Sequence, residues 1–146
     1  MATIYTGGLT SGPIYSKASF PFSGSAAPDT GQALEIVSGS GGRMQCRVCS
    51  TANSADYIGA YDVTNANLSG KTTVQGLMVN PVAGGYFPIF VDATVAQGDH
   101  LVTTAAGVYT PKSGTNTNVV AVAMSSGASG SRIMAKMYDA VVVEGS

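Results

Sequence analysis

The sequence predicts an all-β fold, a small antiparallel β-barrel or sandwich, and three observations carry that prediction. Sixteen valines and six isoleucines outnumber five leucines, and β-branched side chains favour pleated strands over helices. The 19 glycines and six prolines are scattered, so few windows could hold a long helix without a breaker. Short alternating segments separated by turn residues recur from residue 33 onward, as in small barrels and sandwiches.

Residues 1–32 are predicted to form an extended N-terminal arm. The first 28 residues carry one charged side chain, Lys17, and their glycines and prolines preclude an element of ordinary length. Regular apolar residues distinguish this stretch from a solvated tail. Two placements stay open: packing on the chain's own barrel, or lying across a neighbouring subunit. The second placement makes intermolecular anchors of Ile4, Tyr5, Ile14, Tyr15, Phe20 and Phe22.

Residues 33–146 are predicted to form the barrel domain, with eight or nine short strands among ten candidate segments. Turn residues bound each strand segment, as Gly39–Gly42 do after the first of them. In chain order the segments are Ala33–Val37, Arg43–Ser50, Tyr57–Val63, Thr72–Val79, Tyr86–Val91, His100–Thr104, Val108–Thr110, Val119–Met124, Arg132–Tyr138 and Ala140–Glu144.

Apolar patterning predicts where several of these strands lie. In 43–50, Met44, Cys46 and Val48 alternate with polar residues and share one face. Pro88 indicates an edge strand or a bulge, because proline cannot donate to a ladder. Residues 119–124 are apolar on both faces, which is typical of a strand buried from both sides.

The last two segments carry a further expectation. In 132–138, Arg132, Met134 and Lys136 face opposite to Ile133, Ala135 and Met137. The chain ends shortly after three consecutive valines, which we expect to pair with another protomer: Val141, Val142 and Val143.

Charge and hydropathy exclude several classes of partner. The formal net charge is −1 and the pI about 5.6, so a basic nucleic-acid footprint is not expected. Only 10% of the residues are charged, against roughly 25% in an average domain. Such a surface is a weak colloidal stabiliser for a free monomer, which indicates a protein covered by partners. We expect no membrane partner, no secretory signal and synthesis in the cytoplasm.

Candidate catalytic residues are few. Cys46 and Cys49 lie three apart on a predicted strand, so their side chains point to opposite faces and hold neither a shared metal nor an internal disulfide. One is expected in the core and the other outside. Asp99 is interpreted as a turn residue and His100 as the start of a strand, since no nucleophile motif accompanies them.

We therefore expect no enzyme activity, no catalytic residue, no cofactor and no metal site. The eight carboxylates are spread along the chain, although two of them facing each other across a cleft would suit a glycosidase. The glycine-rich runs match neither a P-loop nor a dinucleotide fingerprint.

An ordered series of phrases between Tyr57 and Tyr138 resembles the cement, or head-decoration, proteins of tailed-phage capsids. The phrases are Tyr57-Ile-Gly-Ala-Tyr, Val74-Gln-Gly-Leu-Met-Val, Val91-Asp-Ala-Thr-Val-Ala-Gln-Gly-Asp-His-Leu-Val, Ala106-Gly-Val-Tyr-Thr-Pro, Val119-Val-Ala-Val-Ala-Met and Arg132-Ile-Met-Ala-Lys-Met. Two departures are Ala121, where the family often has glycine, and 105–107, which lack the usual turn Asp or Asn.

The resemblance implies a structural virion protein that binds the outer surface of a mature phage capsid. Its partners would be the major capsid protein and further copies of itself, as a homotrimer with N-terminal arms reaching over capsid subunits. It would bridge capsid subunits and do no chemistry. Deleting residues 1–22 is then expected to abolish capsid binding while the core stays folded.

The alternative is a carbohydrate- or receptor-binding β-module of a viral fibre or collar. Aromatic rings, if exposed, could stack on sugars, although the same rings suit barrel packing and cross-strand pairs. They are Tyr57, Tyr61, Tyr86, Phe87, Tyr109 and Tyr138. A small hydrolase on a barrel scaffold is a third possibility and would need converging carboxylates or a histidine in a cleft.

Overall fold

The computed structural model describes residues 19–67, 77–115 and 117–145, which are all-β apart from two short 3₁₀ turns. The turns are η1 (Ser40–Gly42) and η2 (Val63–Asn65). The strands are β1 (Phe20–Pro21), β2 (Ala33–Ser38), β3 (Met44–Val48), β4 (Tyr57–Ala60), β5 (Ala66–Asn67), β6 (Met78–Val79), β7 (Tyr86–Phe90), β8 (His100–Thr103), β9 (Tyr109–Pro111), β10 (Thr117–Ala123) and β11 (Arg132–Glu144). The all-β prediction is confirmed.

The largest sheet has five antiparallel strands in the order β7-β11-β10-β8-β9. One isolated parallel bridge, between Val91 and Tyr109, links the two edges of this sheet. The sheet therefore curls around its core, yet the sheets are not closed into a barrel. Pro88 lies in the edge strand β7, as predicted, where its missing N–H costs no ladder bond.

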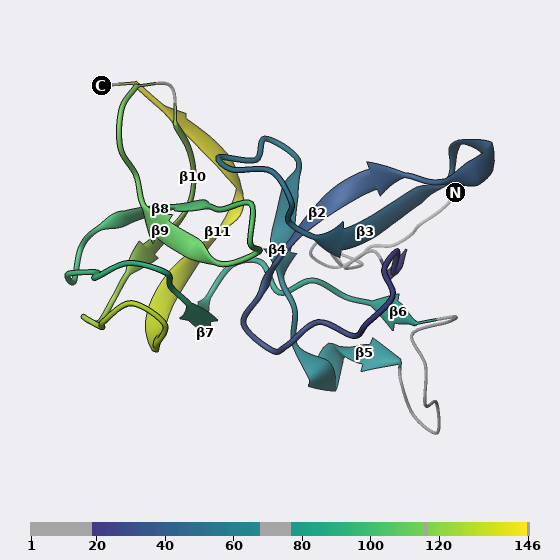
Figure 1. Cartoon of the computed structure of the whole chain (residues 1–146), viewed down its shortest axis with the longest axis horizontal. Coiled ribbons are helices and arrows are strands. Elements are labelled where there is room, and N and C mark those ends of the chain that lie inside the picture. The colour runs from purple at the N-terminus through teal and green to yellow at the C-terminus, as the bar shows by residue number, and fades with distance from the viewer. Residues whose placement is uncertain (1–18, 68–76, 116, 146) are drawn as a thin grey trace, which may run out of the picture.

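Two smaller antiparallel sheets have the orders β3-β2-β4 and β1-β6-β5. The hairpin of β2 and β3 runs away from the five-stranded sheet, and β5 and β6 lie below it in the view of Figure 1. Strand β4 connects the parts of the structure, because it pairs with β2 and also contacts β11.

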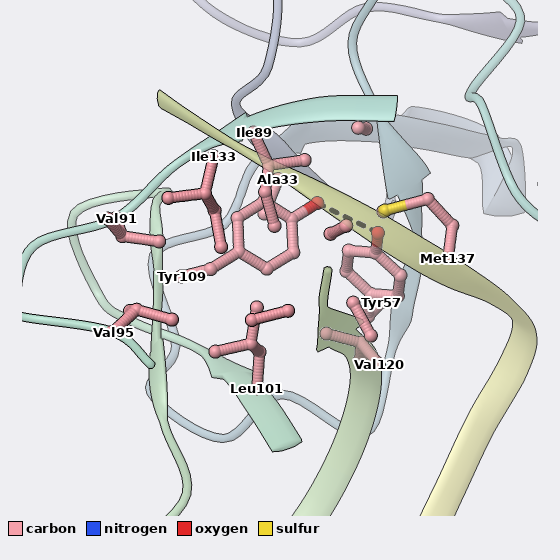
Figure 2. Close-up of a cluster of buried hydrophobic side chains, with 14 of the residues drawn as sticks. Ala33, Tyr57, Ile89, Val91, Val95, Leu101, Tyr109, Val120, Ile133 and Met137 are labelled. Atoms are coloured by element: carbon pink, nitrogen blue, oxygen red, sulfur yellow. Dashed lines mark hydrogen bonds between the residues drawn. The ribbon is translucent and has the colours of Figure 1, made fainter. Parts of the chain in front are cut away.

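The apolar residues divide into two clusters. The larger cluster fills the curled sheet and includes Ile89, Leu101, Tyr109 and Val120 (Figure 2). The smaller cluster lies under the β2–β3 hairpin and contains Leu34, Cys46, Tyr61, Leu77 and Val79. Residues 33–35 of β2 are buried throughout, since β2 is the central strand of its sheet.

Most predicted strands are found within a few residues of their expected bounds. Three predicted segments differ from the observed strands. The predicted strand 72–79 is described only at β6, because residues 68–76 lie outside the described part of the chain. The predicted segments 132–138 and 140–144 form one strand, β11, in which a register shift opposite Val120 lets the ladder with β10 continue past an irregular stretch.

The last part of the predicted arm, residues 19–32, lies against the chain's own sheets. Phe20 pairs with Val79, and the Ser23 N–H donates to the Cys46 carbonyl. Further along, the Gly31 N–H donates to the Tyr61 carbonyl over 2.9 Å. The remainder of the predicted arm, residues 1–18, lies outside the described residues.

Candidate functional site

A buried carboxylate, Glu35, organises the loop between β3 and β4. Its side chain is 2% exposed. One oxygen accepts from the Ser54 hydroxyl at 2.9 Å, and the other accepts from Arg47 Nε at 2.9 Å and from the Ser50 N–H at 3.3 Å. Burial raises the pKa of Glu35, but the hydrogen bonds from Ser54 and Arg47 outweigh it and hold the pKa below its usual value.

The hydrogen bonds around Glu35 link two parts of the fold. Its hydrogen bonds come from the chain itself, and Ser54 is fixed further because its N–H donates to the Thr103 hydroxyl at 2.9 Å. The network therefore ties the β3–β4 loop to the five-stranded sheet, since Thr103 ends β8.

The two cysteines are both buried, which corrects one prediction. Cys46 belongs to the smaller cluster and Cys49 to the larger one, so the expectation that they point in different directions is confirmed. The expected outer thiol is wrong, because the β3–β4 loop carries Cys49 over the second core. Burial raises the pKa of Cys46 to about 11, so this thiol is protonated at neutral pH.

Asp99 and His100 do not form a catalytic pair. Asp99 Oδ2 accepts from the Ala96 N–H at 2.9 Å, which confirms its role in the turn. His100 Nδ1 instead lies 2.8 Å from Glu144 Oε2, while Lys112 Nζ donates to Glu144 Oε1 at 2.7 Å. The hydrogen bonds from Lys112 and His100 lower the pKa of Glu144. This group fastens the end of β11 onto β8 and contains no nucleophile.

The predicted contact residues are distributed over three environments. Ile4, Tyr5, Ile14 and Tyr15 lie outside the described residues. Phe20 and Phe22 are half-buried and pack against the chain's own smaller cluster, because β1 joins the β6 edge and Phe22 bridges to Cys46. A partner can contact only the part of each ring that this packing leaves exposed.

The C-terminal valines have different exposures. Val141 packs against the larger cluster, whereas Val142 is 44% exposed and Val143 is 68% exposed. Residues 142–144 pair with 117–119 of β10 as the far end of the sheet (Figure 1). Consecutive valines on a strand point to opposite faces, so both faces of this end are open to a contact.

Sequence reasoning missed a surface on the outward side of the five-stranded sheet. Register places side chains from three strands in three rows: Val122, Lys136 and Tyr86; then Met124, Met134 and Pro88; then Arg132 and Phe90. We call these eight residues the outer face. Alternation had placed Arg132, Met134 and Lys136 together, which is confirmed, but it gave no neighbours for them.

Two features of the described residues bear on ligand binding: a depression in the surface and the aromatic rings. A depression of about 240 Å³ between β8, β9 and the start of β10 is lined by hydroxyl-bearing and small side chains, with neither a charged nor an aromatic residue among them. Tyr57, Tyr61 and Tyr109 are buried and so offer no face for a sugar. Among the described residues, no three His, Cys, Asp or Glu side chains gather to hold a metal ion.

Comparison with known proteins shows a likeness in fold. Neither a family model nor a curated protein matches the sequence. Among solved structures, the chain is similar to the head fiber gp8.5 N base of bacteriophage phi29, with a TM-score of 0.59 and 16% sequence identity. The likeness covers 86% of this chain and 95% of that one, and at this identity it shows a shared fold. None of the described segments is a helix long and apolar enough to cross a membrane.

Proposed function

We propose that this chain is a structural protein of a phage head, bound to the outer surface of the capsid. The observation that carries the proposal is the fold shared with a phi29 head fiber base over nearly the whole of both chains. The resemblance of residues 57–138 to capsid cement proteins supports the same assignment and rests on sequence phrases, so the two arguments are independent.

The finer proposal is that the protein stabilises the capsid by bridging subunits of the major capsid protein, without chemistry. A ligand that binds assembled subunits and not separated ones stabilises the assembly by mass action. As a homotrimer, the protein would join several weak contacts and gain avidity from their high effective concentration. The exposed Val142 and Val143 support self-association. The small share of charged residues supports a surface that is covered by partner proteins.

Sugar binding, the alternative, receives less support. Of the six rings that could stack on a sugar, three lie in the core and Phe87 packs against it, whereas Tyr86 is 64% exposed. The depression near β9 contains no ring. Stacking on a carbohydrate needs an accessible aromatic face beside polar groups in a hollow. The exposed Tyr86 lies on the sheet opposite Lys136 and does not line the depression.

The test mixes the purified protein with empty expanded and empty unexpanded shells of the same phage and counts bound copies per shell. We expect saturation at a fixed number of copies on expanded shells and a higher disruption temperature for the decorated shells. An absence of binding to both kinds of shell overturns the proposal. Saturable binding without a change in disruption temperature overturns the bridging role, whereas the proposal that the protein attaches to the phage head would still stand.

The structure sharpens the deletion that tests the arm. Removing residues 1–22 would take Phe20 and Phe22 from the smaller cluster, so loss of binding could follow from unfolding. Removing residues 1–18 spares both rings and β1. We expect this shorter deletion to abolish shell binding while the melting temperature stays near that of the full chain. Undiminished binding by the folded deletion variant would contradict the role of the arm.

A further inference from the structure

The outer face has the composition of a protein interface. Three of the seven large apolar side chains that are exposed among the described residues lie on it: Tyr86 at 64%, Met134 at 43% and Met124 at 39%. Met124 and Met134 lie directly opposite each other, since the Met124 N–H donates to the Met134 carbonyl. Tyrosine, methionine and arginine are the residue types enriched where proteins meet, and this sheet face is apolar at its centre.

Two cations flank that apolar centre. Lys136 lies in the first row and Arg132 in the third. Arg132 stacks over the Phe90 ring at 4.5 Å and donates to the Thr30 carbonyl, so its guanidinium is held over the face. The ion pairs among the described residues join Arg47 to Glu35, and His100 and Lys112 to Glu144. Arg132 and Lys136 thus lack a carboxylate partner there.

We propose that the outer face docks on an acidic surface of the capsid shell. This proposal rests on the proposed function and names the chemistry of the contact. The three rows contain no carboxylate, so their charge is complementary to a negative surface. Lys136 lies four positions after Arg132 on β11, which is about 13 Å along a strand. The partner would present an apolar ridge against Met124, Met134 and Pro88, with carboxylates on both sides of it.

The neighbouring acids mark the limits of this surface. Asp92 follows β7 and Asp139 lies beyond Lys136 on β11. The Asp139 carboxylate lies against Gly84, so close that a Cβ atom added at Gly84 would contact Asp139 Oδ1. Both carboxylates lie past the ends of the rows, so the rows themselves carry only the two cations. Complementary charge of this kind sets register and association rate in addition to affinity.

The test measures binding of two charge-reversal variants to expanded shells of the same phage. Lys136→Glu changes the outer face. Arg43→Glu is the matched control, because Arg43 is also exposed, lies between η1 and β3, and carries no ion pair among the described residues. We expect Lys136→Glu to weaken binding at least tenfold, about the effect of losing one close interfacial charge pair, and Arg43→Glu to change it less than twofold. Raising the salt should weaken the wild type more than Lys136→Glu.

Each outcome decides something different. Equal binding by Lys136→Glu and the wild type overturns the outer face as the docking surface and leaves the proposed function standing. Equal weakening by both variants shows an effect of net charge alone and also overturns it. If the wild type binds neither kind of shell, the proposed function fails and the contact fails with it. Melting temperatures of both variants near that of the wild type confirm that folded proteins are compared.

Discussion

The buried pair of Tyr57 and Tyr109 gives a sharp test of how the larger core is held. The two hydroxyls are 2.8 Å apart and the rings meet edge to face, with centroids 6.0 Å apart at 79° (Figure 2). Tyr109 is fully buried and Tyr57 is 7% exposed. Each hydroxyl therefore depends on the other. Replacing either tyrosine with phenylalanine keeps the ring contact but leaves a buried hydroxyl without its partner.

The expected cost follows from that geometry. Tyr57→Phe or Tyr109→Phe alone should lower the free energy of unfolding by about 1–3 kcal/mol, the cost of one buried unsatisfied polar group. The double variant should lose less than the sum, because exchanging both partners for apolar groups of the same shape is nearly neutral. The coupling free energy is then about 1–3 kcal/mol and stabilises the wild type.

Denaturant unfolding followed by circular dichroism measures all four corners of this cycle, provided that the slopes agree. Tyr86→Phe is the control, since Tyr86 is 64% exposed, and it should change the free energy by less than about 0.5 kcal/mol. Additive single and double variants would refute the reasoning, because additivity means that neither hydroxyl relies on the other.

Three further predictions concern the rest of the fold. Gly59→Ala should destabilise the protein by about 1–3 kcal/mol in thermal or chemical unfolding, because φ is +142° and the new Cβ would lie 2.5 Å from the Val82 carbonyl oxygen. Both thiols should resist a thiol reagent in the native protein and react after denaturation, since Cys46 and Cys49 are buried. Because the pKa of Glu35 is lowered on folding, its contribution is present above the unfolded pKa and is lost as pH falls through the folded one. Glu35→Gln should therefore flatten the acid limb of a stability–pH profile.

Local patterning predicted what depends on local chemistry. Alternation in residues 132–137 gave the two faces of β11, and the proline in β7 gave its edge position. Turn residues such as Asp99, which accepts from the Ala96 N–H, gave the breaks between strands. These features follow from the two-residue alternation of a strand and from backbone chemistry within a few residues. They can therefore be predicted from the sequence alone.

Contacts between residues far apart in the sequence could not be predicted from local patterning. The sequence placed one cysteine outside, and the structure buries both, because the β3–β4 loop held by Glu35 turns Cys49 into the larger cluster. The spacing of Phe20 and Phe22 suggested anchors for a neighbouring subunit, yet β1 pairs with β6, and Phe20 lies opposite Val79, which follows it by 59 positions in the sequence. Neither result follows from spacing along the chain.

The outer face shows why a contact surface on a sheet is harder to predict than its strands. Its central row joins Met124, Met134 and Pro88, which belong to three strands and become neighbours only through register. A shift of one residue would send this row into the core and bring Ile133 or Ala135 outside. The burial of Ile133 and Ala135 fixes that register. The same packing that stabilises the core therefore sets the positions of Arg132 and Lys136. A partner that binds between them would depend on the spacing that this register gives them.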